Sequence, residues 1–524
     1  MNIENLLNKK NALIGISILF LFIAIPKIIF PDLDHGDEYS DADVLSSGEN
    51  FVKFGFIKTR FLQMREPHLD KPENLYTHYP GLPDIINGIL RMAFKTDSLR
   101  FFRGISLLFA YLGVLLWYFF IKKVTNSNLI GFFSTVFYLF NPMFIFSADS
   151  LHQLAFSDFL RSLILFVFII MVSSSKPLKQ RRFLILLWFL LFIQTWIGLD
   201  CIIYLFLFFI LYRFFIKIPV KPVSLTVILA LCSAPVAGFL LHVWQNAWYF
   251  GSLTLAVRDL GGAAIERMVA SKDSPMALTF VNWWNNVLLR NFSLVMFYNY
   301  ISLFLAGFSA YFLYQVAAPE HKQEIKNLFR LSLLLVVCGI SWYIFFPAHS
   351  LAHAFVNFLS RHLVPAAALL FGLFFYVVLV FLKKNAPDDR AGKIILAVII
   401  FTIIITGISK SELPVTAKVI RQSKSFLVFK NSLINLKMIS GLKDTVGVNY
   451  FRYPFIRYYT HRHIQPVFDK ASLERQEPLP KYFIFIPYNN QAAQELFGFL
   501  NQKYLPIFRC DSERFPSVFF ELKQ

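Results

Sequence analysis

Long apolar stretches separated by polar segments dominate the pattern of this chain. Each runs for roughly 17–25 residues, which is the length that a helix needs to cross the hydrocarbon core of a bilayer. The pattern predicts a mainly α, polytopic helical membrane protein. Under this length rule we expect about eleven transmembrane helices, at residues 11–30, 101–121, 129–147, 155–173, 183–198, 199–216, 222–246, 294–316, 328–347, 362–382 and 393–408.

Composition excludes a chain that is water-soluble throughout. Of the 524 residues, 56% are hydrophobic and 16% are charged, whereas soluble domains are about 45–50% apolar and about 25% charged. The formal net charge of +19 is first explained by membrane topology and by attraction to anionic lipid, so we expect the lipid bilayer as a partner and no nucleic acid. The four cysteines have no zinc or disulfide spacing, and no glycine-rich phosphate loop is present.

The distribution of Lys and Arg predicts the orientation of the chain. Basic pairs occur at 9–10 and 122–123, and four basic residues lie within 176–182, whereas the connections 147–157 and 198–200 contain none. The positive-inside rule places the basic connections and the N-terminus in the cytoplasm. The first stretch lacks a signal-peptide cleavage pattern and is expected to stay as an anchor. An odd number of spans puts the C-terminus outside.

Two domains are expected. Residues 1–409 form a transmembrane catalytic module with outer loops at 31–99 and 247–291, and residues 410–524 form a soluble extracytoplasmic α/β domain. In this tail the pattern predicts β-strands at 425–430, 481–487, 504–510 and 517–523, and a helix at 491–500.

The first outer loop is unusually rich in carboxylates for a chain with so few charges. Asp37 and Glu38 precede a segment with helical spacing, so they would lie at a helix N-terminus, where the dipole favours an ionised carboxylate. A helix lying in the membrane interface is expected, with an apolar face made by Tyr39, Ala42, Leu45 and Val52. The loop returns to the membrane through 76–83, whose two prolines exclude a helix interior. An acidic outer loop without catalytic function is the alternative.

This layout resembles the type C glycosyltransferases. The shared features are a first span, Asp37-Glu38 opening a juxtamembrane helix that ends at Gly55-Phe56, and the re-entry Tyr76-Thr-His-Tyr-Pro-Gly-Leu-Pro83. Later features agree, namely Asn141-Pro142, an outer hairpin with Asp149, and Ser360-Arg-His-Leu-Val-Pro365. Closest in layout are the bacterial lipid A aminoarabinose transferases and the protein O-mannosyltransferases.

The resemblance implies inverting transfer of a sugar from a polyprenyl-phosphate carrier, such as undecaprenyl phosphate, to an extracytoplasmic glycan, lipid or protein. It implies a multi-pass protein of the bacterial inner membrane. Asp37 corresponds to the catalytic acid of the family, and Glu38 and Asp149 are further catalytic candidates. No cofactor is expected. No metal site is expected either, because a lipid monophosphate does not demand a metal as a diphosphate does.

Donor binding is expected at the re-entry and in two outer hairpins. At the re-entry this chain has His78-Tyr79-Pro80, where the aminoarabinose transferases have Lys-Pro-Pro. Cationic or hydrogen-bonding side chains are required where the leaving phosphate gains charge. The alternative for each candidate is a side chain at the membrane interface whose hydrogen bonds are already made and which binds no substrate. The candidates for donor phosphate or substrate binding are His78, Tyr79, Asp158, His349, His353, Arg361 and His362.

A transporter or flippase for lipid-linked sugars, without transferase activity, is the main competing function. It predicts polar or Gly/Pro-broken spans near the midplane in matched halves, whereas here the spans are nearly uncharged and the polar residues gather in outer loops. A non-catalytic assembly protein would not need the carboxylates. The sequence leaves the sugar and the acceptor open.

Overall fold

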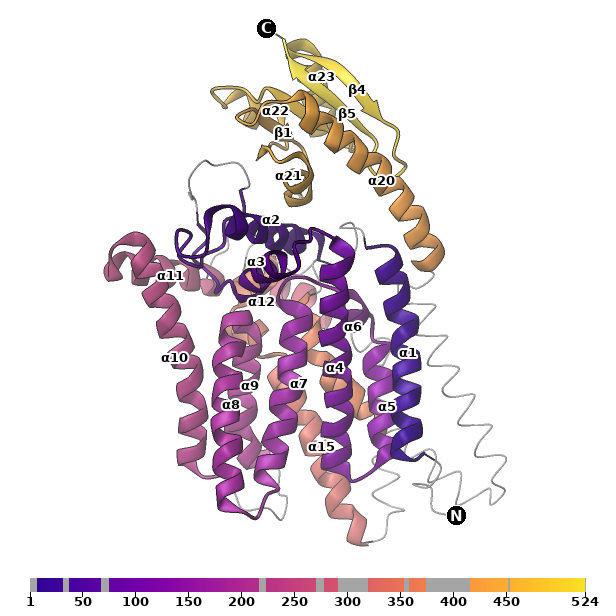
Figure 1. The fold of residues 1–524 in the computed structure, drawn as a ribbon, viewed down its shortest axis with the longest axis vertical. Coiled ribbons are helices and arrows are strands. Elements are labelled where there is room, and N and C mark those ends of the chain that lie inside the picture. Colours follow the sequence, from indigo (N-terminus) through magenta and orange to yellow (C-terminus); the bar gives the residue numbers. More distant parts are fainter. Residues whose placement is uncertain are drawn as a thin grey trace.

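A bundle of long helices lies beneath a small α/β domain in the computed structural model (Figure 1). The structure describes residues 7–31, 37–66, 75–215, 223–269, 278–290, 319–352, 358–373, 415–450 and 453–523. The bundle contains α1 (Lys9–Ile29), α4 (Leu99–Thr125), α5 (Asn128–Leu139), α7 (Gln153–Val172), α8 (Pro177–Ile197), α9 (Leu199–Phe215), α10 (Leu225–Phe250) and α15 (Pro319–Gly339).

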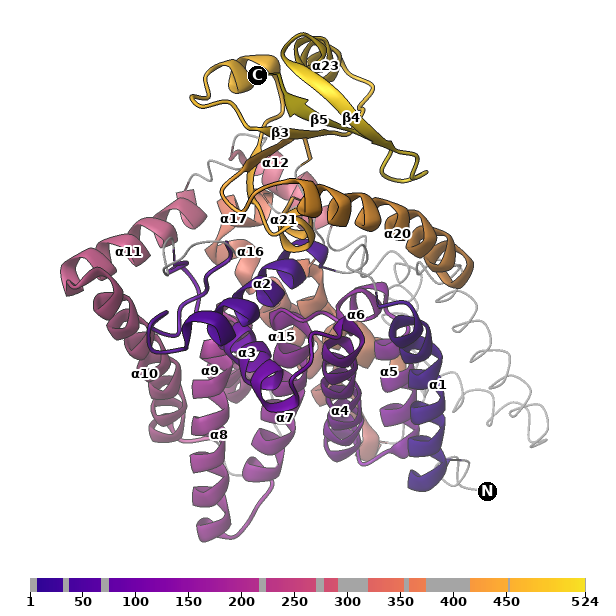
Figure 2. The same cartoon turned by 45° about the horizontal axis from the view of Figure 1, so that its top comes forward.

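Shorter elements gather at the end of the bundle that faces the α/β domain (Figures 1 and 2). They are α2 (Glu38–Phe54), α3 (Leu82–Phe94), α6 (Pro142–Ser147), α11 (Leu253–Val269), α12 (Phe280–Trp283), η2 (Trp284–Leu289), α16 (Ser341–Phe345), α17 (Pro347–Ala352) and η4 (Phe358–Leu363).

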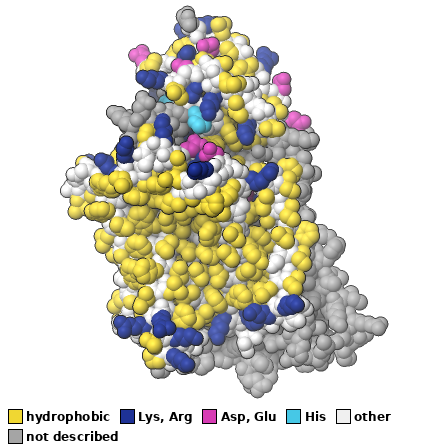
Figure 3. All heavy atoms as spheres, in the orientation of Figure 1, with side chains coloured by type: hydrophobic (Ala, Val, Ile, Leu, Met, Phe, Trp, Pro, Cys, Tyr) yellow, Lys and Arg dark blue, Asp and Glu magenta, His cyan; other side chains and the backbone are white. Residues whose placement is uncertain are grey.

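The bundle is that of an integral membrane protein. Among the described residues, six helices are long and apolar enough to cross a membrane: α1, α4, α7, α8, α10 and the segment Asn327–Phe345. Shorter apolar helices cover Asn128–Leu139, Leu199–Tyr212 and Arg361–Leu373. Figure 3 shows a belt of hydrophobic side chains with Lys and Arg along its lower edge. The spans expected at 294–316 and 393–408 lie outside the described residues.

The stretch 129–147, expected as one span, is divided into α5 and α6. Pro142 occupies the first turn of α6, where its missing N–H costs nothing, and Asn141 caps that turn by accepting a hydrogen bond from the Met143 N–H at 3.0 Å. The span therefore ends before Asn141-Pro142, and this proline and its cap start a new helix.

The C-terminal domain is a five-stranded mixed sheet with helices, as the sequence predicts in outline. The strand order is β2-β1-β3-β5-β4; β1 is parallel to both its neighbours, and β5 is antiparallel to both of its own. The elements are α20 (Val415–Ile439), β1 (Thr445–Val448), α21 (Pro454–Thr460), β2 (His463–Pro466), α22 (Lys470–Glu474), β3 (Tyr482–Phe485), α23 (Gln491–Lys503), β4 (Tyr504–Cys510) and β5 (Ser517–Leu522).

The strand predicted at 425–430 is wrong, because this segment belongs to α20. The buried residues Phe426, Phe429, Leu433 and Leu436 recur at intervals of three and four, which is the period of one helix face. The apolar run was too short for its period to separate a strand from part of a long helix.

Helix α2 forms where the sequence predicts it, but its surroundings differ from those expected. Ala42, Val44 and Leu45 share one buried apolar cluster with residues of the C-terminal domain, among them Phe426 and Phe455. The predicted apolar face of α2 is therefore covered by the C-terminal domain at Ala42 and Leu45. On another side, α2 packs closely on α3 (Figure 2).

Candidate active site

Asp37 is the N-cap of α2. Its carboxylate accepts a hydrogen bond from the Ser40 N–H at 3.4 Å, so the helix begins where the sequence predicts. Burial raises the pKa of Asp37, the hydrogen bonds from Ser40 oppose this, and the charges of Asp43 and Arg361 act in opposite directions. The side chain of Glu38 lies outside the described part of the chain.

A second acid of α2, Asp41, ties the helix to the start of α7. Its Oδ1 accepts hydrogen bonds from the Ser150 hydroxyl at 3.0 Å, the Leu151 N–H at 2.7 Å and the His152 N–H at 3.2 Å. Burial raises the pKa of Asp41 to about 7. This contact holds the first turns of α2 over the end of α7, and the sequence did not single it out.

Below this contact, the structure brings together three of the predicted binding residues. Arg361 pairs with Asp158 at 2.9 Å and with Asp200 at 2.7 Å, and the His362 ring lies 2.9 Å from Asp200. Arg161 joins the network, 3.1 Å from Asp158. Asp200 and Arg161 were missed, although charged residues within apolar stretches are a known sign of function or of buried pairing.

The buried network balances its own charges. Arg161 and Arg361 face Asp158 and Asp200, and all four side chains are almost fully buried. A carrier phosphate would have to compete with two carboxylates for the Arg361 guanidinium. The arrangement therefore favours a positioning role for Arg361, with phosphate binding elsewhere.

Asp149 belongs to a separate ion network. It pairs with Arg103 at 2.6 Å and with Lys27 of α1, and Arg103 also lies 3.5 Å from Asp41. The Asp149 side chain has no exposed surface. This burial between two cations favours a structural role that fixes the ends of α1 and α4 nearest the C-terminal domain, because a removed partner would leave an uncompensated buried charge.

The re-entry segment that precedes α3 is held by α10 and α11. The Thr77 carbonyl accepts hydrogen bonds from His242 and from Asn246, both at 2.9 Å. The Thr77 hydroxyl donates to Asp259 at 2.6 Å, and the predicted binding residue His78 lies 3.5 Å from the same carboxylate.

Two arginines stack on the tyrosines of the re-entry. The Arg65 Cζ lies 3.7 Å from the centre of the Tyr76 ring, and the Arg267 Cζ lies 4.8 Å from that of Tyr79. The two rings are nearly parallel, with centres 6.4 Å apart. Burial raises the pKa of Tyr79, so this predicted residue stays a neutral phenol. The two guanidinium groups thus lie on tyrosines of the same short segment as His78, and the sequence had not marked Arg65.

Two further predicted binding residues are His349 and His353. His349 on α17 accepts a hydrogen bond from the Trp342 indole N–H at 3.3 Å, and His353 lies outside the described residues. Within the described ranges, no group of three or more His, Cys, Asp and Glu side chains is placed to hold a metal ion. The expectation of a metal-independent reaction stays a prediction.

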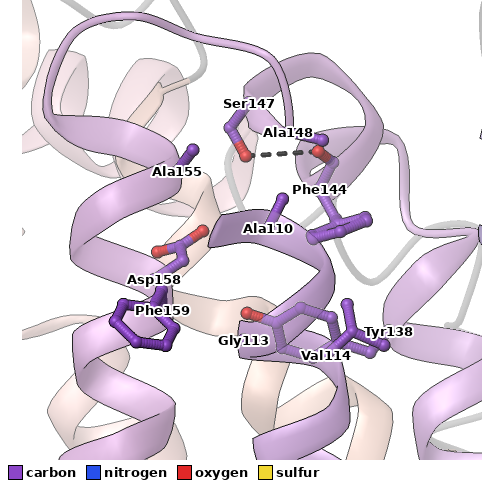
Figure 4. A pocket seen from close by; sticks show the side chains of 10 residues that line it. All are labelled: Ala110, Gly113, Val114, Tyr138, Phe144, Ser147, Ala148, Ala155, Asp158 and Phe159. Carbon is purple, nitrogen blue, oxygen red and sulfur yellow. Dashed lines mark hydrogen bonds between the residues drawn. The ribbon is translucent and has the colours of Figure 1, made fainter. Parts of the chain in front are cut away.

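A narrow crevice lies between α4, α5, α6 and α7, with Asp158 on its wall. Figure 4 shows the residues that line it, most of which are apolar. It is too narrow to hold a water molecule. It is therefore a packing gap beneath the Arg361 network, and not a substrate cavity.

Comparison with known proteins supports a fold assignment. No protein-family model and no curated protein matches the sequence. Solved structures do match in fold, among them the following three. ArnT from Cupriavidus metallidurans bound to undecaprenyl phosphate has a TM-score of 0.57 at 11% identity, over 97% of this chain and 98% of that one.

Two further matching structures are of the oligosaccharyltransferase AglB from Archaeoglobus fulgidus, each at 12% identity. In complex with an inhibitory peptide and a dolichol-phosphate, AglB has a TM-score of 0.56 over 91% of this chain and 69% of that one. The apo form has a TM-score of 0.53 over 90% and 69%. The chain has the type C glycosyltransferase fold. At these identities the likeness concerns the fold, and the chemistry has to be argued from the site.

Proposed function

We propose that this protein is an inverting membrane glycosyltransferase that moves a sugar from a polyprenyl-phosphate carrier to an extracytoplasmic acceptor. The observation that carries the proposal is the position of Asp37, which caps α2 over the end of the bundle where α7, α9 and η4 contribute their buried charges. Similar folds that were solved with undecaprenyl phosphate or with dolichol-phosphate support a lipid-linked donor.

The proposed reaction is a single in-line displacement. The acceptor hydroxyl oxygen bonds to the anomeric carbon while the bond from that carbon to the phosphate oxygen breaks, so the configuration inverts. The hydroxyl proton passes to the Asp37 carboxylate, and the electron pair of the broken bond leaves with the lipid phosphate. Burial raises the pKa of Asp37, which makes its ionised form a stronger base than an exposed carboxylate.

The leaving phosphate needs a cation, and we place that role at the re-entry. His78 and Arg267 lie there, and the Arg267 guanidinium is held over Tyr79 and donates to the Ala263 carbonyl at 3.1 Å. Arg361, in contrast, is engaged by Asp158 and Asp200. Charge-assisted contacts to phosphate stabilise the charge that develops on the leaving group.

For the topology, we propose a cytoplasmic N-terminus, an extracytoplasmic C-terminal domain and a bacterial inner membrane. Lys9 lies over the Phe119 ring at 5.3 Å, so the basic start of α1 and the basic end of α4 share one end of the bundle. Lys27 meets Asp149 at the opposite end, beside α2 and the C-terminal domain. The positive-inside rule assigns the basic end to the cytoplasm.

The test is transfer of radiolabelled sugar from a polyprenyl-phosphate sugar by the purified protein, with extracted envelope glycans, lipids and peptides as acceptors. Label in an acceptor that is lost in Asp37→Asn supports the proposal. A matched control is Asp469→Asn, because this acid caps the short helix α22 in the C-terminal domain. Movement of the intact labelled lipid across reconstituted vesicles, without transfer of sugar, would instead support a flippase.

A further inference from the structure

Helix α2 is held from two sides. Towards the bundle, Asp41 accepts hydrogen bonds from the 150–152 loop. Away from the bundle, the C-terminal domain covers the helix, and both views show α21 directly above it (Figures 1 and 2). The position of Asp37, in the first turn of α2, therefore depends on both sets of contacts.

The strongest polar contact on the outer side is a two-arginine bridge at Asp43. Arg457 of α21 lies 2.6 Å from Asp43 Oδ1, and Arg65, from the loop after α2, lies 3.2 Å from Oδ2. The Asp43 and Arg457 side chains are only 6% and 10% exposed. Charge-assisted contacts in such a buried setting are short and directional, so this bridge fixes a point on α2 relative to the C-terminal domain.

Apolar contacts surround the bridge. Val44 and Leu45 share a buried cluster with Phe426 and Phe455 of the C-terminal domain. At the start of the helix, the Tyr39 ring meets the Tyr453 ring edge-on, with centres 6.0 Å apart. These contacts span the first turns of α2, which are the turns that carry Asp37.

We propose that the C-terminal domain is a positioning domain that sets the geometry of Asp37 through the Arg457–Asp43 ion pair. This inference rests on the proposed function, because it takes Asp37 as the group that meets the acceptor. Asp43 is six residues from Asp37, which is about 9 Å along a helix at 1.5 Å per residue. A tilt at Asp43 therefore moves Asp37, and a misplacement of about 1 Å costs on the order of 10²-fold in rate.

A purely structural role for Arg457 makes different predictions. Loss of stability would lower the amount of folded protein and its melting temperature, and folded molecules would keep their turnover. Loss of positioning lowers kcat per folded molecule and leaves the apparent KM for the lipid donor unchanged, since the donor does not touch Arg457 in the proposal.

The chain offers a matched control in Arg462. This arginine is also buried in the C-terminal domain, and it donates to the Ser440 hydroxyl at 2.9 Å and to the Lys437 carbonyl at 2.7 Å, both within that domain. Arg457→Gln and Arg462→Gln thus remove the same kind of buried cation. Only the first removes a contact with α2.

The experiment compares Arg457→Gln, Arg457→Lys and Arg462→Gln in full-length protein, by hydrogen exchange of the α2 amides and by kinetics with a polyprenyl-phosphate sugar. We expect faster α2 exchange and a kcat lowered about 10–100-fold in Arg457→Gln, with partial recovery in the lysine variant. Arg462→Gln should lower the melting temperature without either effect. Folded protein is quantified by size-exclusion chromatography, so kcat refers to folded molecules.

The pH profile gives a readout that instability does not move. Asp37 faces the charges of Asp41 and Asp43 on its own helix and of Arg361 on η4. Without Arg457 the negative charge of Asp43 is less compensated, and this charge raises the pKa of Asp37. The acid limb of the kcat profile should therefore move to higher pH in Arg457→Gln and stay in place in Arg462→Gln.

The inference would be overturned by unchanged α2 exchange in Arg457→Gln, or by an equal loss of kcat per folded molecule in both glutamine variants. Faster exchange with unchanged kcat would refute the positioning role as well. Absence of turnover in the parent protein would refute the proposed function, whereas the exchange measurement would still decide the docking of α2.

Discussion

The Arg361 guanidinium and the Asp200 carboxylate lie 2.7 Å apart, although 161 residues separate them in the sequence. Asp200 lies in the first turn of α9 and Arg361 lies in η4, so the ion pair joins two elements near the end of the bundle that faces the C-terminal domain. Together with Asp158 and Arg161 it forms a compact set of buried charges beneath Asp37. Arg361 was predicted to bind the donor phosphate, but its ion pairs make it a candidate for positioning the elements beneath Asp37.

Asp37→Asn is expected to abolish sugar transfer and to leave folding intact. The change keeps the shape of the side chain and removes the proton acceptor, and general-base catalysis is worth roughly 10²–10⁴-fold. Initial rates with saturating lipid donor measure the effect. Asp469→Asn serves as the control, and retention of more than about a tenth of the parent rate would exclude Asp37 as the base, given that range.

Arg361→Ala is expected to act on stability first. It leaves the Asp200 and Asp158 carboxylates without their shared partner, and breaking a buried pair costs about 3–5 kcal/mol. Thermal unfolding in detergent, followed by size-exclusion chromatography, measures this loss. A stable Arg361→Ala protein with a raised KM for the lipid donor would contradict this expectation and would indicate that Arg361 binds the donor phosphate.

Arg267→Ala is expected to raise the apparent KM for the lipid donor and to leave the melting temperature nearly unchanged. Its guanidinium stacks on Tyr79 at the re-entry, where we place the phosphate. Arg267→Lys should recover only part of the affinity, because an ammonium keeps the charge but loses the planar fork. Arg258, on the same helix, is the matched control. Equal KM values in Arg267→Ala and Arg258→Ala would show that Arg267 does not bind the phosphate.

The contact between Glu66 and His463 is expected to weaken as the pH rises. The side chains lie 3.2 Å apart, and their hydrogen bond lowers the pKa of Glu66 and raises the pKa of His463. A raised histidine pKa contributes stability that is fully present below the ordinary value of 6.5 and is lost as the pH passes through the raised value. The glutamate contribution is fully present above its ordinary value of 4.5 and is lost as the pH falls through the lowered value.

The pair therefore joins the first outer loop to the C-terminal domain best between these two ordinary values. Because the His463 side chain is half-exposed, the effect is about 0.2–1 kcal/mol. Hydrogen exchange at β2 and at the loop before residue 66, compared at pH 6 and pH 8, measures it. The buried Asp41, whose pKa burial raises to about 7, titrates in the same range, so the His463→Gln variant isolates the pair. A pH dependence that survives in that variant would contradict the assignment.

A cysteine introduced at Asn489, an exposed residue of the C-terminal domain, is expected to react with a membrane-impermeant thiol reagent in intact cells whose outer barrier has been opened. A cysteine at Lys123, at the basic end of α4, should react only after lysis. The native cysteines Cys201, Cys338 and Cys510 are buried and Cys232 is partly buried. Both cysteines are introduced into a variant without these four, so that only the introduced thiol can react. The reverse pattern would invert the proposed topology.

Among the described residues, the sequence by itself predicted the long apolar helices, the start of α2 and three of the five strands of the sheet. A span shows itself locally, because lipid requires about 20 consecutive apolar residues whatever their neighbours are. The helix start at Asp37 could also be predicted, since a capping side chain acts on the first turn of the helix that follows it. The strands β3, β4 and β5 were found where β-rich runs are bounded by turn residues.

Only the tertiary structure decided which charges meet and what covers α2. Asp43 and Arg457 are 414 positions apart in the sequence, and Asp200 and Arg361 are 161 positions apart. No local spacing therefore marks either pair. The segment 425–430 failed for a related reason, since its apolar period became clear only over the full length of α20. Side-chain pairing and the docking of one domain on another depend on where the folded chain places distant residues, whereas capping and membrane insertion depend on neighbours in the sequence.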